Sequence, residues 1–176
     1  MRPPVDAGRI RRFFEEAGRA ADRETRIYLT GGATAVLHGW RVSTIDLDLK
    51  IVPESDALLR ALPEIKESLR INVELASPDH FIPELPGWAA RSSFVAREGK
   101  VSFYHYDYYA QALAKLERGH AQDLADVGEM SRRGLIETSR LRGLFDAIGP
   151  QLYRYPALDA ASFRRALEEF LKTIEG

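Results

Sequence analysis

The segment from Tyr28 to Ile51 restricts the fold more than any other part of this sequence. It opens with a strand-sized apolar run that stops at Gly31 and Gly32, and a helical pattern starts directly after them. From Thr44 to Val52 polar and apolar residues alternate, with Ile45 among the expected buried positions, as in a strand with one buried face. A strand, a glycine turn, a helix and a second strand in so short a stretch predict a fold that mixes helices and strands.

Two features of this segment are able to carry chemistry. Gly31 and Gly32 lie at a predicted helix N-terminus, where free backbone amides and the helix dipole attract phosphate. Asp46 and Asp48 are two positions apart on the alternating strand, so their carboxylates face the same way and can share hard cations such as Mg²⁺. Each feature alone has an ordinary explanation, a turn or a solvated strand face. Together they predict a nucleotidyl-transfer site, because metal ions can neutralise a triphosphate.

Other elements follow from the same kinds of pattern. A first helix is expected to reach about Arg23. A later helix starts at a Ser55 cap, and Pro63 predicts a break within it. The run INVEL predicts a strand with Asn72 and Glu74 on one face, and a functional acid there competes with an ordinary surface glutamate.

The second half of the chain changes from strands to helices. A Pro-rich stretch, 77–88, predicts a loop, and the following hairpin is expected to turn at Glu98-Gly99. After Asp107 the helical period persists, with Gly119, Gly134 and Gly149 as expected terminators. We therefore expect an α+β fold with a mixed sheet of about five strands flanked by helices, residues 1–107 as the core, and residues 108–176 as a helical region that packs on the sheet and completes a nucleotide cleft.

Composition excludes several classes of protein. The chain has 176 residues and no cysteine, which excludes thiol catalysis, thiolate zinc sites and disulfides. A formal net charge of -1 argues against an indiscriminate polyanion binder, although a local basic patch could still hold nucleic acid. The four histidines contain no i, i+4 pair, so a histidine metal site is not expected. Neither a membrane-spanning run nor a signal-peptide segment is visible, and we expect a cytoplasmic protein with no membrane partner.

The sequence resembles the DNA polymerase beta-type nucleotidyltransferases on the Gly31-Gly32 helix start and the Asp46-x-Asp48 strand. Within that superfamily it is most similar to small bacterial proteins related to the AbiEii-type toxins. The resemblance rests on the stretch RVSTIDLD, residues 41–48, and on two charged pairs in the helical region. These pairs are Lys115 with Arg118 and Asp123 with Asp126.

The resemblance implies roles for individual residues. A carboxylate at Glu74 completes the metal triad with Asp46 and Asp48 or deprotonates the acceptor hydroxyl. Lys115 contacts a phosphate, and Asp123 orients Lys115 or the base. The remaining nucleotide-binding candidates are Arg41, suited to the leaving pyrophosphate, its neighbours Ser43 and Thr44, and, more weakly, Arg91. Without the resemblance, the helical charges would be a solvated surface.

The implied activity is transfer of a nucleoside monophosphate from an NTP, with Mg²⁺ or Mn²⁺, to an acceptor. By resemblance, that acceptor is an RNA or tRNA end or a protein, and the protein is a toxin neutralised by an antitoxin partner. The alternatives are a catalytically degenerate member that binds nucleotide or protein without turnover, and a metal-dependent nuclease. The aromatic residues from Phe103 to Tyr109 either stack a base or belong to the core.

Overall fold

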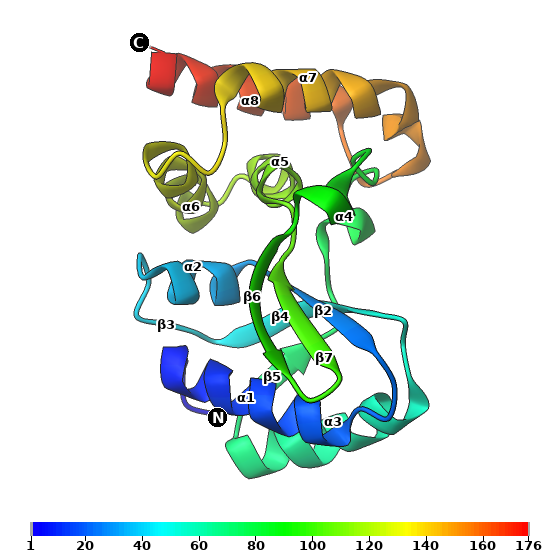
Figure 1. The fold of residues 1–176 in the computed structure, drawn as a ribbon. Coiled ribbons are helices and arrows are strands. Elements are labelled where there is room, and N and C mark those ends of the chain that lie inside the picture. Colours follow the sequence, from blue (N-terminus) through cyan, green and yellow to red (C-terminus); the bar gives the residue numbers. More distant parts are fainter. Residues whose placement is uncertain (1, 176) are drawn as a thin grey trace. The chain divides into compact units, whose positions relative to one another are not determined.

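The computed structural model describes residues 2–175, which divide into two compact units (Figure 1). The first unit comprises residues 2–77 and 92–106 and contains the strands. The second comprises residues 78–91 and 107–175 and is helical, so the Pro-rich stretch groups with the C-terminal helices. Among the described residues, no helix combines the length and apolar character needed to cross a membrane.

The first unit is built on a five-stranded mixed sheet with the order β5-β4-β2-β7-β6. Its strands are β2 (Thr25–Thr30), β4 (Asp46–Val52), β5 (Asn72–Glu74), β6 (Ser93–Glu98) and β7 (Val101–His105). β2 pairs antiparallel with β4 and parallel with β7, while β5 is parallel to β4 and β6 antiparallel to β7. A separate short ladder joins β1 (Val5–Asp6) to β3 (Ser43–Thr44). The predicted α+β class, five-stranded mixed sheet and hairpin are confirmed.

The helices of this unit are α1 (Ala7–Ala20), α2 (Gly32–His38) and α3 (Asp56–Leu69). Ser55 caps α3 as predicted, because its hydroxyl accepts the Leu58 N–H at 3.4 Å. The expected break at Pro63 is wrong, since α3 continues through it. Proline removes one helix hydrogen bond, but the buried Leu62 and Ile65 on either side anchor both halves to the core.

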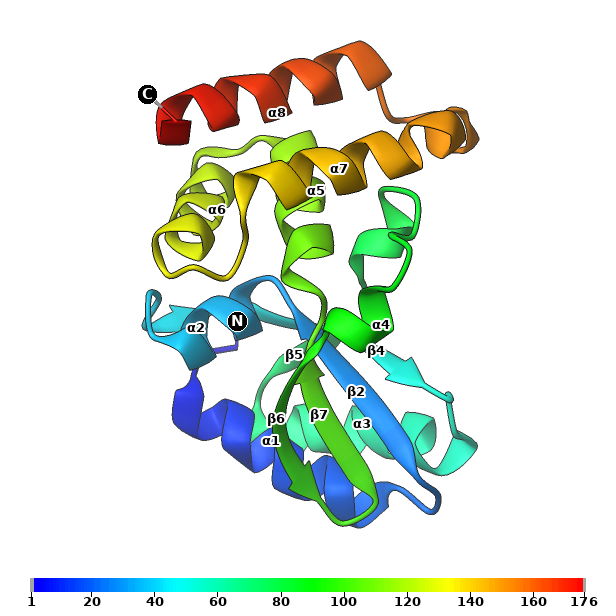
Figure 2. The same cartoon turned by 45° about the horizontal axis from the view of Figure 1, so that its top comes forward.

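One face of the sheet is apolar and the other polar. α1 and α3 pack against each other on the apolar face (Figure 2), where the rings of Phe14 and Phe103 stack at 4.0 Å. Of the four apolar positions that the alternation predicts to be buried, Leu47, Leu49 and Ile51 of β4 are buried, but Ile45 is not. That residue is 69% exposed because it lies between β3 and β4, where the regular strand has not begun. Its expected burial is wrong.

The second unit consists of short connected helices. They are η1 (Pro78–His80), α4 (Trp88–Arg91), α5 (Tyr108–Arg118), α6 (Ala121–Arg132), α7 (Thr138–Ile148), η2 (Gly149–Arg154) and α8 (Ala160–Glu175). Gly119 ends α5 with a left-handed backbone, as predicted. Gly149 does not act as a terminator of that kind. It has φ −47° and starts the 3₁₀ helix η2, because Pro150 continues the chain with a helical φ.

His105 is a buried imidazole at the end of β7. Its Nδ1 lies 3.0 Å from the Thr34 hydroxyl, and its ring stacks on His38 at 4.7 Å. Burial, followed by the charges of His38 and Arg11, lowers the pKa of His105 to about 3. The folded protein therefore keeps this ring neutral at pH values where the unfolded chain protonates it.

We expect the free energy of unfolding to fall as the pH drops from the unfolded histidine value of about 6.5 toward 3, by up to about 1.4 kcal/mol per pH unit. The sign follows because the unfolded state binds the extra proton throughout this window. Denaturant unfolding at several pH values measures the slope, and His105→Gln should flatten it. Equal slopes for the two proteins would contradict the assignment.

Candidate active site

Strand register places the three predicted carboxylates on one face of the sheet. β4 and β5 run parallel with Asp46 opposite Asn72 and Asp48 opposite Glu74. Residues opposite each other in a ladder share a face, and so do residues two apart on one strand. Asp46, Asp48 and Glu74 therefore all lie on the polar face, with Asp48 and Glu74 as cross-strand neighbours. Their shared face is as predicted, although Glu74 is itself exposed at the end of an edge strand.

Thr30 also belongs to this row, and the sequence alone did not indicate it. It is the last residue of β2 and pairs with Asp48 on the side away from Glu74. The row across the sheet is thus Glu74, Asp48, Thr30. The only sequence signal for Thr30 is its position directly before Gly31, where the strand ends.

Gly31 brings the start of α2 next to the Asp48 carboxylate. Its backbone has φ 59° and ψ −127°, a combination that glycine adopts far more readily than other residues. A Cβ at this position would lie 3.4 Å from Asp48 Oδ2. The glycine turn and the Asp48 carboxylate are therefore neighbours, which brings backbone amides of the kind that can bind an anion next to a carboxylate of the kind that can bind a cation.

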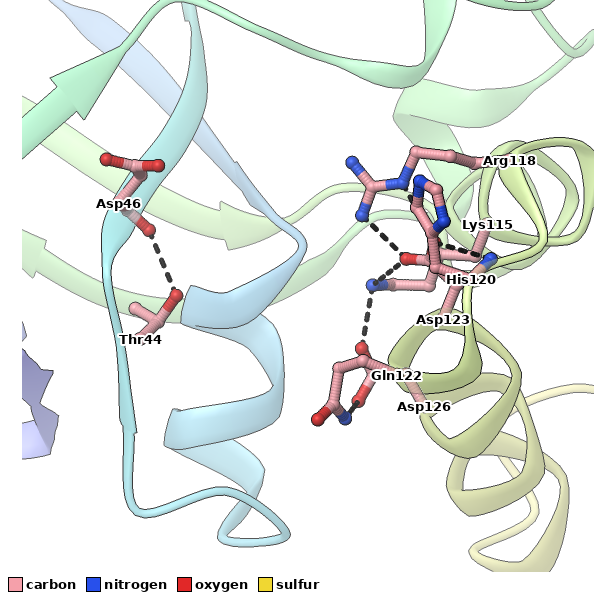
Figure 3. A network of polar contacts seen from close by, with 8 residues as sticks. All are labelled: Thr44, Asp46, Lys115, Arg118, His120, Gln122, Asp123 and Asp126. Carbon is pink, nitrogen blue, oxygen red and sulfur yellow. Dashed lines mark hydrogen bonds and ion pairs between the residues drawn. The ribbon is translucent and has the colours of Figure 1, made fainter.

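Gly32 is required by the close approach of Thr44. A Cβ on Gly32 would lie 2.0 Å from the Thr44 hydroxyl oxygen and 2.6 Å from its Cβ. Thr44 in turn donates its hydroxyl hydrogen to the main-chain oxygen of Asp46 at 3.2 Å (Figure 3). The Asp46 carboxylate takes no part in this hydrogen bond. Gly32 and Thr44 together fix the backbone from which Asp46 projects.

We expect Gly32→Ala to lower the free energy of unfolding by about 2 kcal/mol or more, because the added methyl overlaps Thr44. Denaturant unfolding measures the loss. Gly143→Ala is the control: its site on α7 is open, so the better helix former should stabilise by up to about 1 kcal/mol. Adding Thr44→Gly to Gly32→Ala should restore part of the loss, since it removes the overlapping atoms. Full stability of Gly32→Ala would contradict the packing argument.

The carboxylates supply only oxygen donors, which suits Mg²⁺ or Mn²⁺. Within residues 2–175, no group of three His, Asp or Glu side chains is arranged to hold a metal ion. Mg²⁺ is usually bound by one or two carboxylates together with substrate phosphates and water. The oxygen donors of Asp46 and Asp48 therefore fit such an ion, which would take its remaining ligands from phosphate and water.

Arg41 and Ser43, two further predicted nucleotide-binding residues, are positioned by main-chain contacts within the first unit. Arg41 follows α2, and its N–H donates to the Ala35 carbonyl at 3.3 Å. Ser43 is held by β3, where it pairs with Asp6. Their contacts with a nucleotide stay predictions.

Arg91, the weaker candidate, belongs to the second unit. Its guanidinium donates to Asp107 Oδ2 at 2.6 Å and to the Pro86 carbonyl at 2.7 Å. Asp107 is 1% exposed and also caps α5 by accepting the Tyr109 N–H at 3.2 Å. Arg91 therefore has a structural task, which is to neutralise a buried capping carboxylate.

Lys115 and its neighbours form a charge network in the second unit (Figure 3). The Lys115 ammonium donates to Asp126 Oδ2 at 2.8 Å and lies 3.7 Å from Asp123 Oδ1. Arg118 binds both oxygens of Asp123, at 2.8 and 2.7 Å. Asp126 also accepts from the Gln122 amide at 3.1 Å.

This network modifies the predicted role of Asp123. Asp126 is the direct hydrogen-bond partner of Lys115, whereas Asp123 is bound mainly by Arg118 and by the His120 N–H. Burial raises the pKa of Asp123, but the Arg118 hydrogen bonds and charge, with Lys115 and the His120 N–H, outweigh it, so the pKa is lowered. The i, i+3 spacing of the two aspartates was the sequence signal for Asp126. Contact of Lys115 with phosphate stays a prediction, as does the cleft that these helices were expected to complete.

The aromatic run is divided between core and surface. Phe103 and Tyr106 are fully buried, while Tyr104 lies on the polar face of β7 and is half-buried. Tyr108 and Tyr109 belong to α5, and the Tyr109 hydroxyl accepts the Glu137 N–H at 3.0 Å. Tyr104 is thus the half-buried member of the run on the face that carries the carboxylates, and the buried Tyr106 meets Tyr28 of the same face edge-on at 6.2 Å.

In comparisons with curated proteins and with solved structures, nothing matches the chain significantly. A family described as nucleotidyltransferase of unknown function (DUF6036) matches residues 9–174. The match covers both units, the glycine turn, all three carboxylates and the Lys115 network. The finer similarity to AbiEii-type toxins stays a prediction. With nearly its whole length matched, the chain belongs to this family of nucleotidyltransferases of unknown function.

Proposed function

We propose that the protein transfers a nucleoside monophosphate from an NTP to an acceptor hydroxyl and releases pyrophosphate, with Mg²⁺ or Mn²⁺ as the cofactor. The observation that most supports this is the row of Glu74 and Asp48 beside the Gly31 turn. Phosphate-binding amides and metal-binding carboxylates are both needed for phosphoryl chemistry, and here they are adjacent.

In this proposal each group of the site has a separate role. The amides at Gly31 and Gly32 hold the triphosphate, and Asp46 and Asp48 hold the cation. A bound divalent cation neutralises charge on the phosphates during the in-line displacement. Glu74 accepts the proton of the attacking hydroxyl, and its exposed position at the strand end leaves it accessible to an incoming acceptor. Arg41 offsets the charge of the leaving pyrophosphate.

A nucleotide- or protein-binding module without turnover is the second candidate. The exposure of Glu74 favours it, because a carboxylate in water at the end of an edge strand is held less firmly than a buried catalytic acid. An RNA end or a protein as acceptor, and a toxin role with an antitoxin partner, rest on the AbiEii-type resemblance and are part of the proposal.

Incubation with each α-labelled NTP, Mg²⁺ or Mn²⁺, and either total RNA or cell protein tests the proposal. Covalent label on either acceptor, dependent on the metal, supports transfer. NTP binding without label in any acceptor supports the binding module. Shortened RNA without incorporated label would indicate a nuclease instead.

A further inference from the structure

The polar face of the sheet extends well beyond the carboxylates. Next to the Glu74-Asp48-Thr30 row lies a second row across β4, β2, β7 and β6. Its members in order are Lys50, Tyr28, Tyr104 and Phe94. A third row across β2, β7 and β6 is formed by Arg26, Ser102 and Arg97. The face therefore changes from acidic to aromatic and cationic along the strands.

Direct contacts hold the aromatic row together. The rings of Tyr28 and Tyr104 stack at 5.4 Å, and Phe94 meets Tyr104 edge-on at 5.7 Å. The Arg26 guanidinium lies over the Tyr104 ring at 6.0 Å. Arg97 donates to the Ser102 hydroxyl at 3.0 Å, which places it on the same face. Tyr28 is buried beneath this layer, so the accessible rings are Tyr104 and Phe94.

Three side chains of this layer are exposed to solvent. Phe94 is 60% exposed, an unusual position for a large apolar ring, and Arg26 and Arg97 are also exposed. Arg97 pairs with Glu24 at 2.7 Å, but both side chains reach water, and such pairs are weak and easily exchanged. We call Arg26, Lys50, Phe94, Arg97 and Tyr104 the cationic strip.

We propose that the cationic strip binds single-stranded nucleic acid, with phosphates on Arg26, Lys50 and Arg97 and bases stacked on Tyr104 and Phe94. Aromatic rings beside cations are the combination that holds single strands with little sequence preference. A peptide acceptor offers no regular negative charge to match three cations on one face. The role of the strip as the acceptor site rests on the proposed function. Lys50 is two residues from Asp48, about 7 Å along β4. A nucleic acid bound to the strip can therefore extend to the carboxylates.

Fluorescence anisotropy with a labelled oligouridylate, without NTP or metal, tests binding by the whole chain. Phe94→Ala should weaken binding about 10-fold, because stacking of one base is lost. Arg26→Ala and Arg97→Ala should each reduce the slope of log affinity against log salt by about 0.7. Arg12→Ala on α1 is the matched control, since this exposed arginine lies on a helix of the opposite face and should leave binding unchanged. Unfolding curves of each variant confirm that it is folded.

The outcomes separate this proposal from the proposed function. Asp46→Asn should bind the oligonucleotide as wild type does while losing transfer, which would support both. Label transferred to a protein, with no oligouridylate binding, would overturn the strip and leave transferase activity intact. Equal affinities and salt slopes for wild type, Phe94→Ala and the strip arginine variants would also overturn it.

Discussion

Asp46→Asn is expected to lower metal-dependent nucleotidyl transfer by at least about 100-fold while the protein stays folded. Asparagine lacks the negative charge with which Asp46 binds the metal ion. The metal ion stabilises the charge of a phosphoryl-transfer transition state by several kcal/mol, so weaker metal binding slows the reaction. Folding should be unaffected, because the Thr44 contact uses the main-chain oxygen of Asp46, which asparagine retains. Initial rates with labelled NTP and thermal unfolding measure the two effects.

Asp22→Asn is the matched control for this variant. It makes the same change of charge at an exposed position of the same unit, and the hydrogen bond from Lys100 goes to the Asp22 main-chain oxygen, which asparagine retains. It should retain wild-type transfer. Wild-type activity of Asp46→Asn would remove the metal assignment and, with it, the reason to call the sheet face catalytic.

Features that depend on local sequence could be predicted. The common face of Asp46 and Asp48 follows from the period of a strand, which holds wherever the strand lies in a sheet. The left-handed end of α5 at Gly119 follows from backbone sterics alone. The glycine turn before α2 is of the same kind. These predictions needed no knowledge of what packs against what.

Features that depend on partners distant in sequence could not be predicted. Thr30 and Glu74 flank Asp48 only because β2 and β5 pair with β4 in one register. Pro63 stays helical because buried neighbours outweigh one lost hydrogen bond. The resemblance implies that Thr44 binds a phosphate. In the structure the Thr44 hydroxyl donates to the Asp46 main-chain oxygen and occupies the space left open by Gly32.

The Lys115 network predicts the largest loss of stability. Asp126 is 0% exposed and Lys115 is 8% exposed, so both charges have left water and depend on each other. We expect Asp126→Ala to lower the free energy of unfolding by about 3 to 5 kcal/mol, because it leaves a buried ammonium without its hydrogen-bonded partner. Asp123, at 3.7 Å from the ammonium, already shares its charge with Arg118 and compensates only in part.

Glu129→Ala on the same helix is the control. Its ion pairs with Arg132 and Arg133 are partly exposed, and their loss should cost less than about 1 kcal/mol. Replacing the pair together, with Lys115→Met and Asp126→Leu, should recover much of the Asp126→Ala loss, since no unpaired charge is then buried at this point. Denaturant unfolding of the four proteins, wild type included, measures these differences. If Asp126→Ala cost no more than Glu129→Ala, the ammonium would have to reach water in the folded protein, where it would be accessible to a phosphate.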